Sequence, residues 1–233
     1  MMEEMGIVDA LIIDMNAGKY GADDKLPSEN EMADRFKVPR IKIRKVYERL
    51  QELGYIYSQQ GKGSFVKDRK CQIPLVLSGD VSFSKKMAEQ GYQFESKNIF
   101  CEEINHNPKI YQSLGVTEAE RVFKVGRLRL VDQRPIALHI SYVAKSIFND
   151  IDIDGKKITS MFGYYNRKGY RDFSSKSSVL SVVFPSAVER DILECSSLVP
   201  LLALESGCID IKTDTVLEHT KILYRSDSFT YVI

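Results

Sequence analysis

The chain has 233 residues, of which 43% are hydrophobic and 28% charged, as is typical of a globular protein. No apolar run approaches the ~20 residues of a membrane-spanning helix, which excludes an integral membrane protein and predicts no membrane partner. The 33 basic and 32 acidic residues give a net charge of +1, so the whole-chain charge favours no particular partner.

The cysteines and histidines argue against metal and redox chemistry. The four cysteines include no C-x-x-C pair, and the three histidines lie far apart in the sequence. We therefore predict reduced thiols in a cytosol, no metal site and no cofactor. The N-terminus is acidic and leads into an amphipathic segment, unlike a secretory signal, which also favours a cytoplasmic location.

Three helices are predicted at the start of the chain. Apolar side chains at helical spacing over 8–15 predict a first helix that ends at Gly18. The S-x-x-E pattern at 28–31 is a capping box, which begins a second helix. Pro39 interrupts that helix and suits the first turn of a third helix, which runs to about Leu53.

The third helix carries a local excess of positive charge. Residues 35–49 hold seven basic residues and one acidic residue, Glu48, a local net charge of +6. The apolar residues of this helix fall on one face and the basic residues on the other. A charge run is usually a solvated helix face, but two short helices with the basic face on the second also suit the major groove of DNA.

A hairpin follows the third helix. The segments YIY at 55–57 and SFV at 64–66 flank a tip in which Gly61 lacks side-chain bulk and Lys62 is basic. Such a tip can approach a phosphate backbone or a minor groove closely. The three helices and the hairpin together predict a winged helix-turn-helix domain.

These residues resemble the GntR family of bacterial transcription regulators over roughly 5–67. The resemblance is carried by LPSENE at 26–31, VPR at 38–40, IR at 43–44, Leu50, GYI at 54–56 and GKGSFV at 61–66. It implies that Arg40 and Arg44 contact the operator from the recognition helix, with Gly61 near the minor groove. Asn30, Pro39 and the pair at 41–42 depart from the usual family pattern, so the operator can differ from the typical one.

The predicted DNA-binding residues come from the second helix, the recognition helix and the hairpin. They are Ser28, Arg40, Lys42, Arg44, Lys45, Gly61, Lys62 and Ser64. For Arg40 and Arg44 the alternative is a surface salt bridge, and for Lys45 it is solvated surface with no role.

The rest of the chain alternates strand-like and helix-like segments without an internal repeat. Helices are predicted over 84–90, 107–115, 158–167 and 185–194, and strands over 94–104, 121–131, 136–143, 172–183, 201–211, 215–225 and 229–232. Hairpin-length loops join most of the strands, so this half is predicted to be α+β with an antiparallel sheet. We expect a DNA-binding domain over 1–68, a linker over 69–80 and an effector-binding domain over 81–233.

Strand alternation places two arginines side by side. Arg127 and Arg129 share a strand face with Phe123, Val125 and Val131, and together they form a fork that suits a phosphate or a carboxylate. The alternative is a cross-strand salt bridge.

Two other predicted strands carry polar residues on one face. His139 shares its face with Ala137 and Ser141, where a lone histidine is more often structural. Glu218 and Tyr224 share the face of Val216, Thr220 and Ile222, so we expect these two side chains to line one cavity.

This half resembles the UTRA ligand-binding domain of the HutC subfamily, a chorismate-lyase-like α+β fold. The matching segments are SFS at 82–84, GRLR at 126–129, RPIA at 134–137, SMFG at 160–163, EHT at 218–220 and YRSD at 224–227. The effector-binding residues that we predict are Ser82, Phe83, Arg127, Arg129, His139, Ser160, Glu218 and Tyr224.

The resemblance gives these residues roles as in members that bind phosphorylated sugars. It implies that the two serines and the two arginines hold the phosphate, that Phe83 forms a wall, and that Glu218 and Tyr224 approach the sugar hydroxyls. His139 stands where many sugar binders have a glutamate and Phe162 where a tyrosine is common. A non-sugar ligand therefore stays open.

Both resemblances predict a one-component bacterial repressor. It would bind a palindromic double-stranded DNA operator as a homodimer, under the control of a small effector, a phosphorylated sugar or another small organic anion. The alternatives are an activator and a regulator that responds to a protein or to a non-sugar ligand. An enzyme of the chorismate-lyase type is disfavoured, because the sequence has no nucleophile elbow, metal cluster or glycine-rich phosphate loop.

Overall fold

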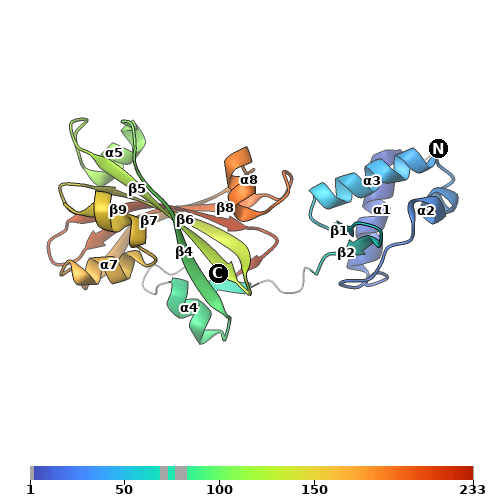
Figure 1. Ribbon diagram of the computed structural model, residues 1–233, viewed down its shortest axis with the longest axis horizontal. Helices are drawn as coiled ribbons and strands as arrows, with labels where there is room; N and C mark the ends of the chain where they lie inside the picture. The colour runs from blue at the N-terminus through green and yellow to red at the C-terminus, as the bar shows by residue number, and fades with distance from the viewer. Residues whose placement is uncertain (1–2, 69–72, 77–82, 233) are drawn as a thin grey trace.

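Figure 1 shows a small helical domain at the N-terminus and a larger domain built on a β-sheet. The structure is a computed structural model and describes residues 3–68, 73–76 and 83–232. Helices and a hairpin come first, and a largely antiparallel β-sheet with short helices follows. The α+β class predicted from the sequence is confirmed.

The helices of the N-terminal domain are α1 (Glu4–Asn16), α2 (Glu29–Phe36) and α3 (Arg40–Glu52). The predicted capping box begins α2: the Ser28 hydroxyl accepts a hydrogen bond from the Glu31 N–H at 3.3 Å, and the Glu31 carboxylate accepts one from the Ser28 N–H at 2.7 Å. Lys37 ends α2 in the left-handed conformation, and Pro39 is the N-cap residue of α3. The tight turn between the two helices is thus fixed at both ends.

The wing consists of β1 (Ile56–Gln59) and β2 (Gly63–Val66), which pair antiparallel with Ile56 opposite Val66. Gly61 and Gly63 have φ of +74° and +113°, a conformation that L side chains rarely adopt, so glycine is needed at this tip. The domain core packs the apolar faces of the three helices against the wing, with Ile7, Leu11, Met32, Ile43, Leu50 and Ile56 buried.

A six-stranded antiparallel sheet forms the second domain. In spatial order its strands are β4 (Phe94–Glu103), β5 (Val122–Val131), β6 (Arg134–Ala144), β9 (Val216–Arg225), β8 (Leu201–Asp210) and β7 (Phe173–Val183). The β5–β6 loop is shorter than predicted: Asp132 and Gln133 alone form the turn, both with positive φ. A turn of this kind matches the twist of the two strands.

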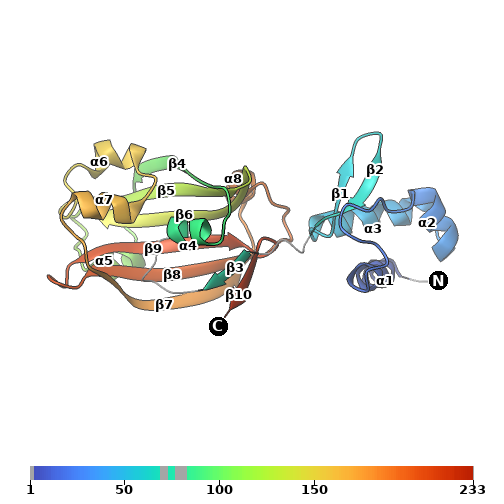
Figure 2. The same cartoon turned by 90° about the horizontal axis from the view of Figure 1, so that it is seen from below.

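Helices cover both faces of the sheet (Figure 2). On one face, α5 (Pro108–Leu114) packs on Val122 and Val216, and α8 (Ala187–Leu193) packs on Leu138 and Leu223. The other face carries α4 (Phe83–Glu89), α6 (Ile151–Asp154) and α7 (Met161–Arg167). The α4 and α7 packing regions lie at opposite ends of β5 and β6, which leaves the middle of this face between two hydrophobic clusters.

Several elements differ from the sequence prediction. β3 (Ile73–Val76) lies inside the predicted linker over 69–80 and pairs in parallel with β10 (Phe229–Val232). Its partner is distant in the sequence, so no local pattern reveals the pairing. The chain also forms α6 and a short 3-10 helix (Gly155–Lys157) that the pattern did not predict, and α7 begins at Met161 instead of at 158.

Val216 was predicted on the face of Glu218 but packs with α5 on the opposite face. A register shift between Cys208 and Ile209 of β8 interrupts the alternation there. Among residues 3–68, 73–76 and 83–232, no helix has the length and apolar character needed to cross a membrane.

Candidate nucleic-acid interface and effector site

The exposed face of α3 carries the predicted DNA-binding residues of the recognition helix. The Arg40 and Arg44 side chains are 57% and 49% exposed, and Lys45 is also exposed. Lys42 is less exposed than these three residues, being half-buried, and lies at the edge of the same face. The opposite face of the helix buries Ile43 and Leu50 in the domain core. The amphipathic division expected from the sequence therefore holds, and the basic side is turned to solvent.

Both arginines contact one carboxylate. Glu29 Oε2 lies 2.7 Å from Arg40 Nε, and Glu29 Oε1 lies 3.5 Å from Arg44 Nε. The predicted alternative, a surface salt bridge, is thus present in this structure. Such an exposed pair contributes little to stability, typically less than about 1 kcal/mol.

The remaining DNA-binding candidates lie at the cap of α2 and on the wing. The Ser28 hydroxyl is engaged in the capping box, and the Ser64 hydroxyl lies 3.2 Å from that of Ser58. Gly61 and Lys62 are exposed at the wing tip, and a Cβ placed on Gly61 would meet only open space. Of these four, Lys62 is therefore best placed to reach a phosphate.

Arg127 and Arg129 are buried in the middle of the sheet face between α4 and α7. Each is only 4% exposed. Arg127 Nη2 donates to the Ser141 hydroxyl, and Arg129 Nη1 donates to the Ser96 hydroxyl and, at 3.1 Å, to the Thr159 carbonyl. Among the described residues, neither guanidinium forms an ion pair with a carboxylate, so the predicted alternative of a cross-strand salt bridge is not what this structure contains.

Burial changes the electrostatics of this pair. It lowers the pKa of both arginines, and the adjacent Arg127 charge helps to bring the pKa of Arg129 down to about 9. Arg129 is therefore still charged at neutral pH, but at a desolvation cost that an anion beside it would offset.

Other polar atoms in the same region are buried without a hydrogen-bond partner in the described part of the chain. They are Arg127 Nε, Arg129 Nε, His139 Nε2, Tyr165 Oη and Glu218 Oε2. Such atoms are rare in folded proteins, because an unpaired buried polar group costs about 1–3 kcal/mol. Their concentration at one place indicates a site that a polar ligand or ordered water completes.

His139 is neutral at physiological pH. Its ring makes edge-on contacts with Phe83 and Tyr224, with ring centroids 5.1 and 5.8 Å away. Burial, together with the positive charges of Arg129 and Arg127, holds the pKa of His139 well below its usual range. It can therefore offer a neutral donor or acceptor to a ligand but adds no third charge to the arginine pair.

The structure brings most of the predicted effector residues together. Phe83, Arg127, Arg129, His139, Glu218 and Tyr224 are all buried on one face of the sheet or on the helix that covers it. Ser160 is half-buried, and its hydroxyl accepts the Gly163 N–H at 3.2 Å as the N-cap of α7, which occupies part of its hydrogen-bonding capacity. Ser82 lies outside the described residues.

Ser96, Tyr165 and Thr220 contribute to the site without having been predicted. Ser96 lies opposite Arg129 in the β4–β5 register, and Thr220 Oγ1 lies 3.3 Å from the Ser141 hydroxyl. Tyr165 reaches the site from α7, and burial followed by the Glu218 charge raises the pKa of its hydroxyl. Ser96 depends on the register between β4 and β5, for which the sequence of one strand gives no signal, whereas Thr220 was predicted on the face of Glu218 and Tyr224 but not assigned to the site.

Two protein families account for most of the chain. Residues 4–66 match the gntR family of bacterial regulatory proteins, and residues 89–230 match the UTRA domain. The chain belongs to the GntR family, in the group of regulators that carry a UTRA domain. The expected combination of domains is therefore confirmed, and so is the expectation of a DNA-binding transcription regulator in place of an enzyme.

Known members of this GntR/UTRA group align along almost the whole chain. The transcriptional repressor NagR of Bacillus subtilis is 25% identical over 226 residues, which cover 97% of this chain and 91% of NagR. A probable fructoselysine utilization operon repressor of Escherichia coli is 26% identical over 227 residues, 96% of this chain and 90% of that protein. The crystal structure of PhnF from Mycobacterium smegmatis has a TM-score of 0.61 at 20% identity and covers 97% of this chain and 95% of its own.

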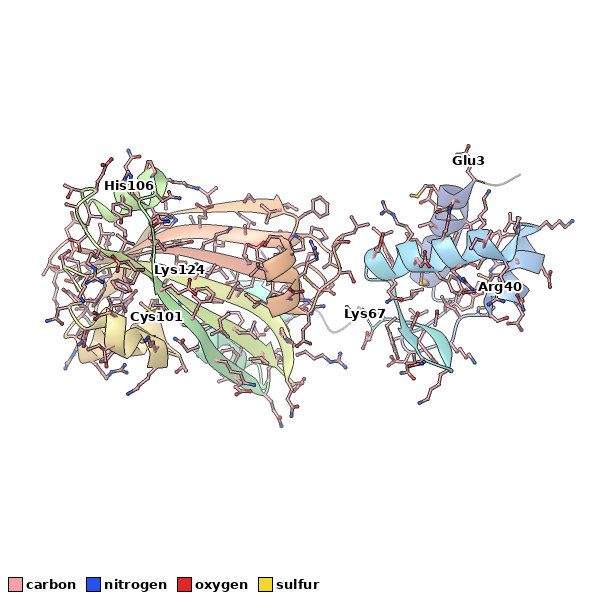
Figure 3. The ribbon with its side chains drawn as sticks, turned by 45° about the horizontal axis from the view of Figure 1, so that its top comes forward. Glu3, Arg40, Lys67, Cys101, His106 and Lys124 are labelled. Carbon is pink, nitrogen blue, oxygen red and sulfur yellow. The ribbon has the colours of Figure 1, made fainter. Side chains whose placement is uncertain are left out.

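The fold of this GntR/UTRA protein positions two separate candidate sites. Arg40 lies on the side of the N-terminal domain that is remote from the sheet, and Lys67 lies on the side that faces it (Figure 3). The buried arginine pair lies inside the second domain. Among the described residues no group of histidine, cysteine or carboxylate side chains is arranged to hold a metal ion.

Proposed function

We propose that this protein is a cytoplasmic transcriptional repressor that binds a palindromic operator as a homodimer and is controlled by a small organic anion, a phosphorylated sugar in the first place. The observation that carries the effector part is the pair Arg127 and Arg129, buried without a carboxylate partner among the described residues. Two adjacent desolvated guanidinium groups bind a phosphate or carboxylate more strongly than any neutral ligand.

The operator side rests on the exposed α3 face and the wing. Arg40 and Arg44 are one helical turn apart on the solvent face, where they can reach base edges, and Lys62 at the wing tip can reach the backbone. Lys45 and Lys42 would contribute through phosphates. Ile41, exposed on the same face, is of the kind that packs on a thymine methyl group.

A sugar is favoured over other anions for two reasons. The buried arginines are surrounded by groups that suit hydroxyls, namely Ser141, Thr220, Tyr165 and Glu218. In addition, two relatives are named for sugar-derived systems, fructoselysine utilization and mannosyl-D-glycerate transport and metabolism. His139 and Phe162 stand where sugar-binding members commonly have a glutamate and a tyrosine, so the sugar that this chain takes can differ from theirs.

The homodimer is supported by strand β7. This strand is an edge of the sheet, and Val179, Leu180, Val182 and Phe184 in and after it are exposed. An exposed apolar edge strand is a template for pairing with another strand. A second copy of β7 running antiparallel would satisfy the free backbone N–H and C=O groups of both edge strands. The two copies would then be related by two-fold symmetry, which matches a palindromic operator.

The first test measures ligand response. Arg127→Met together with Arg129→Met keeps most of each side-chain stem and removes both charges. We expect the wild-type melting temperature to rise with one or more sugar phosphates or small anions, and the double variant to lose that response while it retains operator binding. Because the variant also removes two unpaired buried charges, its ligand-free stability should be unchanged or higher.

Arg121→Met is the matched control. Arg121 stands next to the start of β5 but is exposed and paired with Glu103, with Arg121 Nη2 and Glu103 Oε2 2.6 Å apart. This variant should respond to ligand as the wild type does. A full ligand response in the Arg127→Met, Arg129→Met protein would place the effector site elsewhere and contradict the proposal.

The operator part is tested by fluorescence anisotropy on a duplex from the DNA upstream of the gene, with excess unrelated DNA. Arg40→Ala or Arg44→Ala should weaken specific binding by about 1–3 kcal/mol per base-reading arginine. Unchanged specific affinity in both variants would contradict the assignment of α3 as the reading helix. Sedimentation of the protein as a monomer at micromolar concentration would contradict the dimer.

A further inference from the structure

Glu29 is the first residue of α2, and its carboxylate lies between the two arginines of α3 that we assign to operator reading. Each carboxylate oxygen faces a different arginine: Oε2 is 2.7 Å from Arg40 Nε, and Oε1 is 3.5 Å from Arg44 Nε. The Glu29 side chain is 26% exposed, whereas both arginines extend well into solvent. The carboxylate therefore contacts the Nε side of the two guanidinium groups.

The contact uses the Nε edge of each guanidinium. Among the described residues, the terminal Nη groups of Arg40 and Arg44 donate no hydrogen bond, and the distances to Glu29 are those of the Nε atoms. These Nη groups are the pair that binds O6 and N7 of guanine when an arginine approaches a base edge end-on. Glu29 thus holds each arginine by the side that such a contact does not need.

Arg40 and Arg44 are four residues apart on one helix face, so their charges repel each other. A carboxylate between them offsets this repulsion and restricts two long side chains that would otherwise sample many rotamers. The hydrogen bond from Arg40 lowers the pKa of Glu29, which keeps the carboxylate charged at neutral pH.

The carboxylate is itself held by a rigid element. Glu29 follows Ser28, whose side chain and backbone N–H both take part in the capping box at the start of α2. A negative charge in the first turn also interacts favourably with the helix dipole. Side chains that are ordered before binding lose less entropy when they meet DNA.

We propose that Glu29 is a positioning residue for sequence reading, which orders Arg40 and Arg44 so that their Nη groups face the bases, and which lowers affinity for DNA of random sequence. This role rests on the proposed operator binding by α3. The second effect follows from charge, because a carboxylate near the phosphate backbone opposes contacts that depend on electrostatics alone. Glu29 therefore increases the ratio of specific to non-specific affinity.

The test compares two Glu29 variants of the full-length protein. The specific probe is a duplex that the wild-type protein selects from a random-sequence library, and the non-specific probe is a scrambled duplex of equal length. Glu29→Gln removes the charge, and Glu29→Asp keeps it but shortens the side chain by one methylene. We expect both variants to lower the ratio of specific to non-specific affinity by at least about fivefold. This factor corresponds to the lower end of the discrimination that one bidentate base contact provides.

The two variants should differ in their affinity for the scrambled, non-specific duplex. Glu29→Gln should bind the scrambled duplex more tightly than the wild type, whereas Glu29→Asp should bind it as the wild type does. A residue that only stabilised the fold would change the melting temperature and leave the affinity ratio intact. That result in both variants would overturn the role of Glu29.

Glu52→Gln is the matched control. Glu52 pairs with Arg49 at 3.1 Å on the same helix, away from Arg40 and Arg44, and the variant removes one charge from the same domain. It should leave the affinity ratio unchanged. A drop equal to that of Glu29→Gln would mean that any lost carboxylate has this effect, which would overturn the proposal.

An Arg40→Met, Arg44→Met background separates this role from operator binding itself. If the two arginines read bases, this background lowers the affinity ratio, and adding Glu29→Gln to it lowers the ratio no further. A reduced ratio in the arginine variant with no change in the Glu29 variants would overturn only the positioning role. An unchanged ratio in the arginine variant, or a wild type that selects no sequence, would overturn the reading by α3 and the role of Glu29 with it.

Discussion

Arg127 and Arg129 extend from alternate positions of β5 into the interior, where, among the described residues, their hydrogen bonds go to neutral oxygens. The Ser141 hydroxyl and the Thr159 carbonyl bind the guanidinium groups without neutralising them. Because a buried charge is stable only when it is compensated, this arrangement is better suited to a liganded state than to an empty one. A binding site that is costly when empty gives a large response when an anion enters.

The low pKa of His139 predicts a pH dependence of folding. In the folded protein His139 stays neutral, whereas in the unfolded chain it takes up a proton as the pH falls below ~6.5. Acid therefore favours the unfolded state, and the stability present above pH ~6.5 is lost as the pH decreases. Burial also lowers the pKa of His219, which acts in the same direction. Each histidine contributes up to about 1.4 kcal/mol per pH unit.

Urea unfolding between pH 7.5 and 5 measures this effect. His139→Gln should reduce by about half the decrease in unfolding free energy between pH 7.5 and 5, regardless of its effect on stability at pH 7.5. The control is His106→Gln, because His106 lies outside the site, packed edge-on against Tyr111. Identical pH slopes for the wild type and His139→Gln would show that His139 is not held neutral in the folded protein.

Sequence alone was enough to predict the site residues whose placement follows from side-chain alternation along a single strand. Alternation placed Arg127 and Arg129 on one face, and their burial follows from the apolar neighbours on that face. Ser96 was missed because its contact with Arg129 depends on how β4 aligns with β5, and this register includes a shift between Asn98 and Phe100. Tyr165 was missed because it reaches the site from a helix that packs across the strands.

Gly126 of β5 shows how a glycine accommodates the irregular pairing of β5 with β4. A Cβ at Gly126 would lie 2.2 Å from the Phe100 ring, which occupies the space above the glycine. Phe100 pairs with Gly126 directly after the register shift in β4. The aromatic ring therefore fills the gap that the bulge and the missing side chain leave between the strands.

Gly126→Ala should destabilise the second domain by about 1–3 kcal/mol, because the ring must move before the methyl group fits. Gly207→Ala in β8 is the control: its Cβ would meet only the Glu218 carbonyl oxygen at 3.9 Å, an ordinary contact. Thermal unfolding of both variants measures the difference. Equal melting temperatures would mean that the Phe100 ring can move without cost.

Most elements were predictable because their signals are local. The capping box of α2, the glycine-containing wing and the hairpins formed by β5 with β6 and by β8 with β9 all lie within short segments of sequence. The pairing of β3 with β10 joins segments about 150 residues apart and leaves no such signal. The bulge that moves Val216 to the α5 face is likewise a property of two strands and not of one.

At the scale of the whole molecule, the two domains meet at polar contacts and at the buried side chain of Val199, which lies against Gly54. Lys67, which follows the wing, pairs with Asp227 at 2.8 Å, and the Ser196 hydroxyl donates to the Gln51 carbonyl of α3 at 3.2 Å. Figure 1 shows α8 and the adjoining loop on the side of the sheet that faces α3. Domains within one chain are expected to change their relative arrangement unless the interface between them is large and hydrophobic.

The same strand serves the site and the contact between domains. Tyr224 of β9 faces the candidate effector site, and the next residue, Arg225, points to the opposite face, where it donates to Asp227 and to the Leu193 carbonyl. Burial alone would raise the pKa of Asp227, but Arg225 and Lys67 outweigh it and hold this pKa well below its usual range. A ligand that moves Tyr224 therefore acts on the neighbour of Arg225, and Arg225 binds the same Asp227 carboxylate that Lys67 contacts.

Lys67→Gln removes the ion pair between the domains and leaves Arg225 bound to Asp227. Because Lys67 is partly exposed, the loss of folding free energy should stay below about 1 kcal/mol. The effect should instead appear in amide hydrogen exchange of the ligand-free full chain, which should become faster in the loop at 195–200 and at the end of α3. Lys97→Gln removes an exposed pair with Glu95 inside the second domain and serves as the control. If exchange in these two segments is as slow in Lys67→Gln as in the control, the Lys67–Asp227 pair does not hold the domains together, and other contacts such as Ser196 with Gln51 must do so.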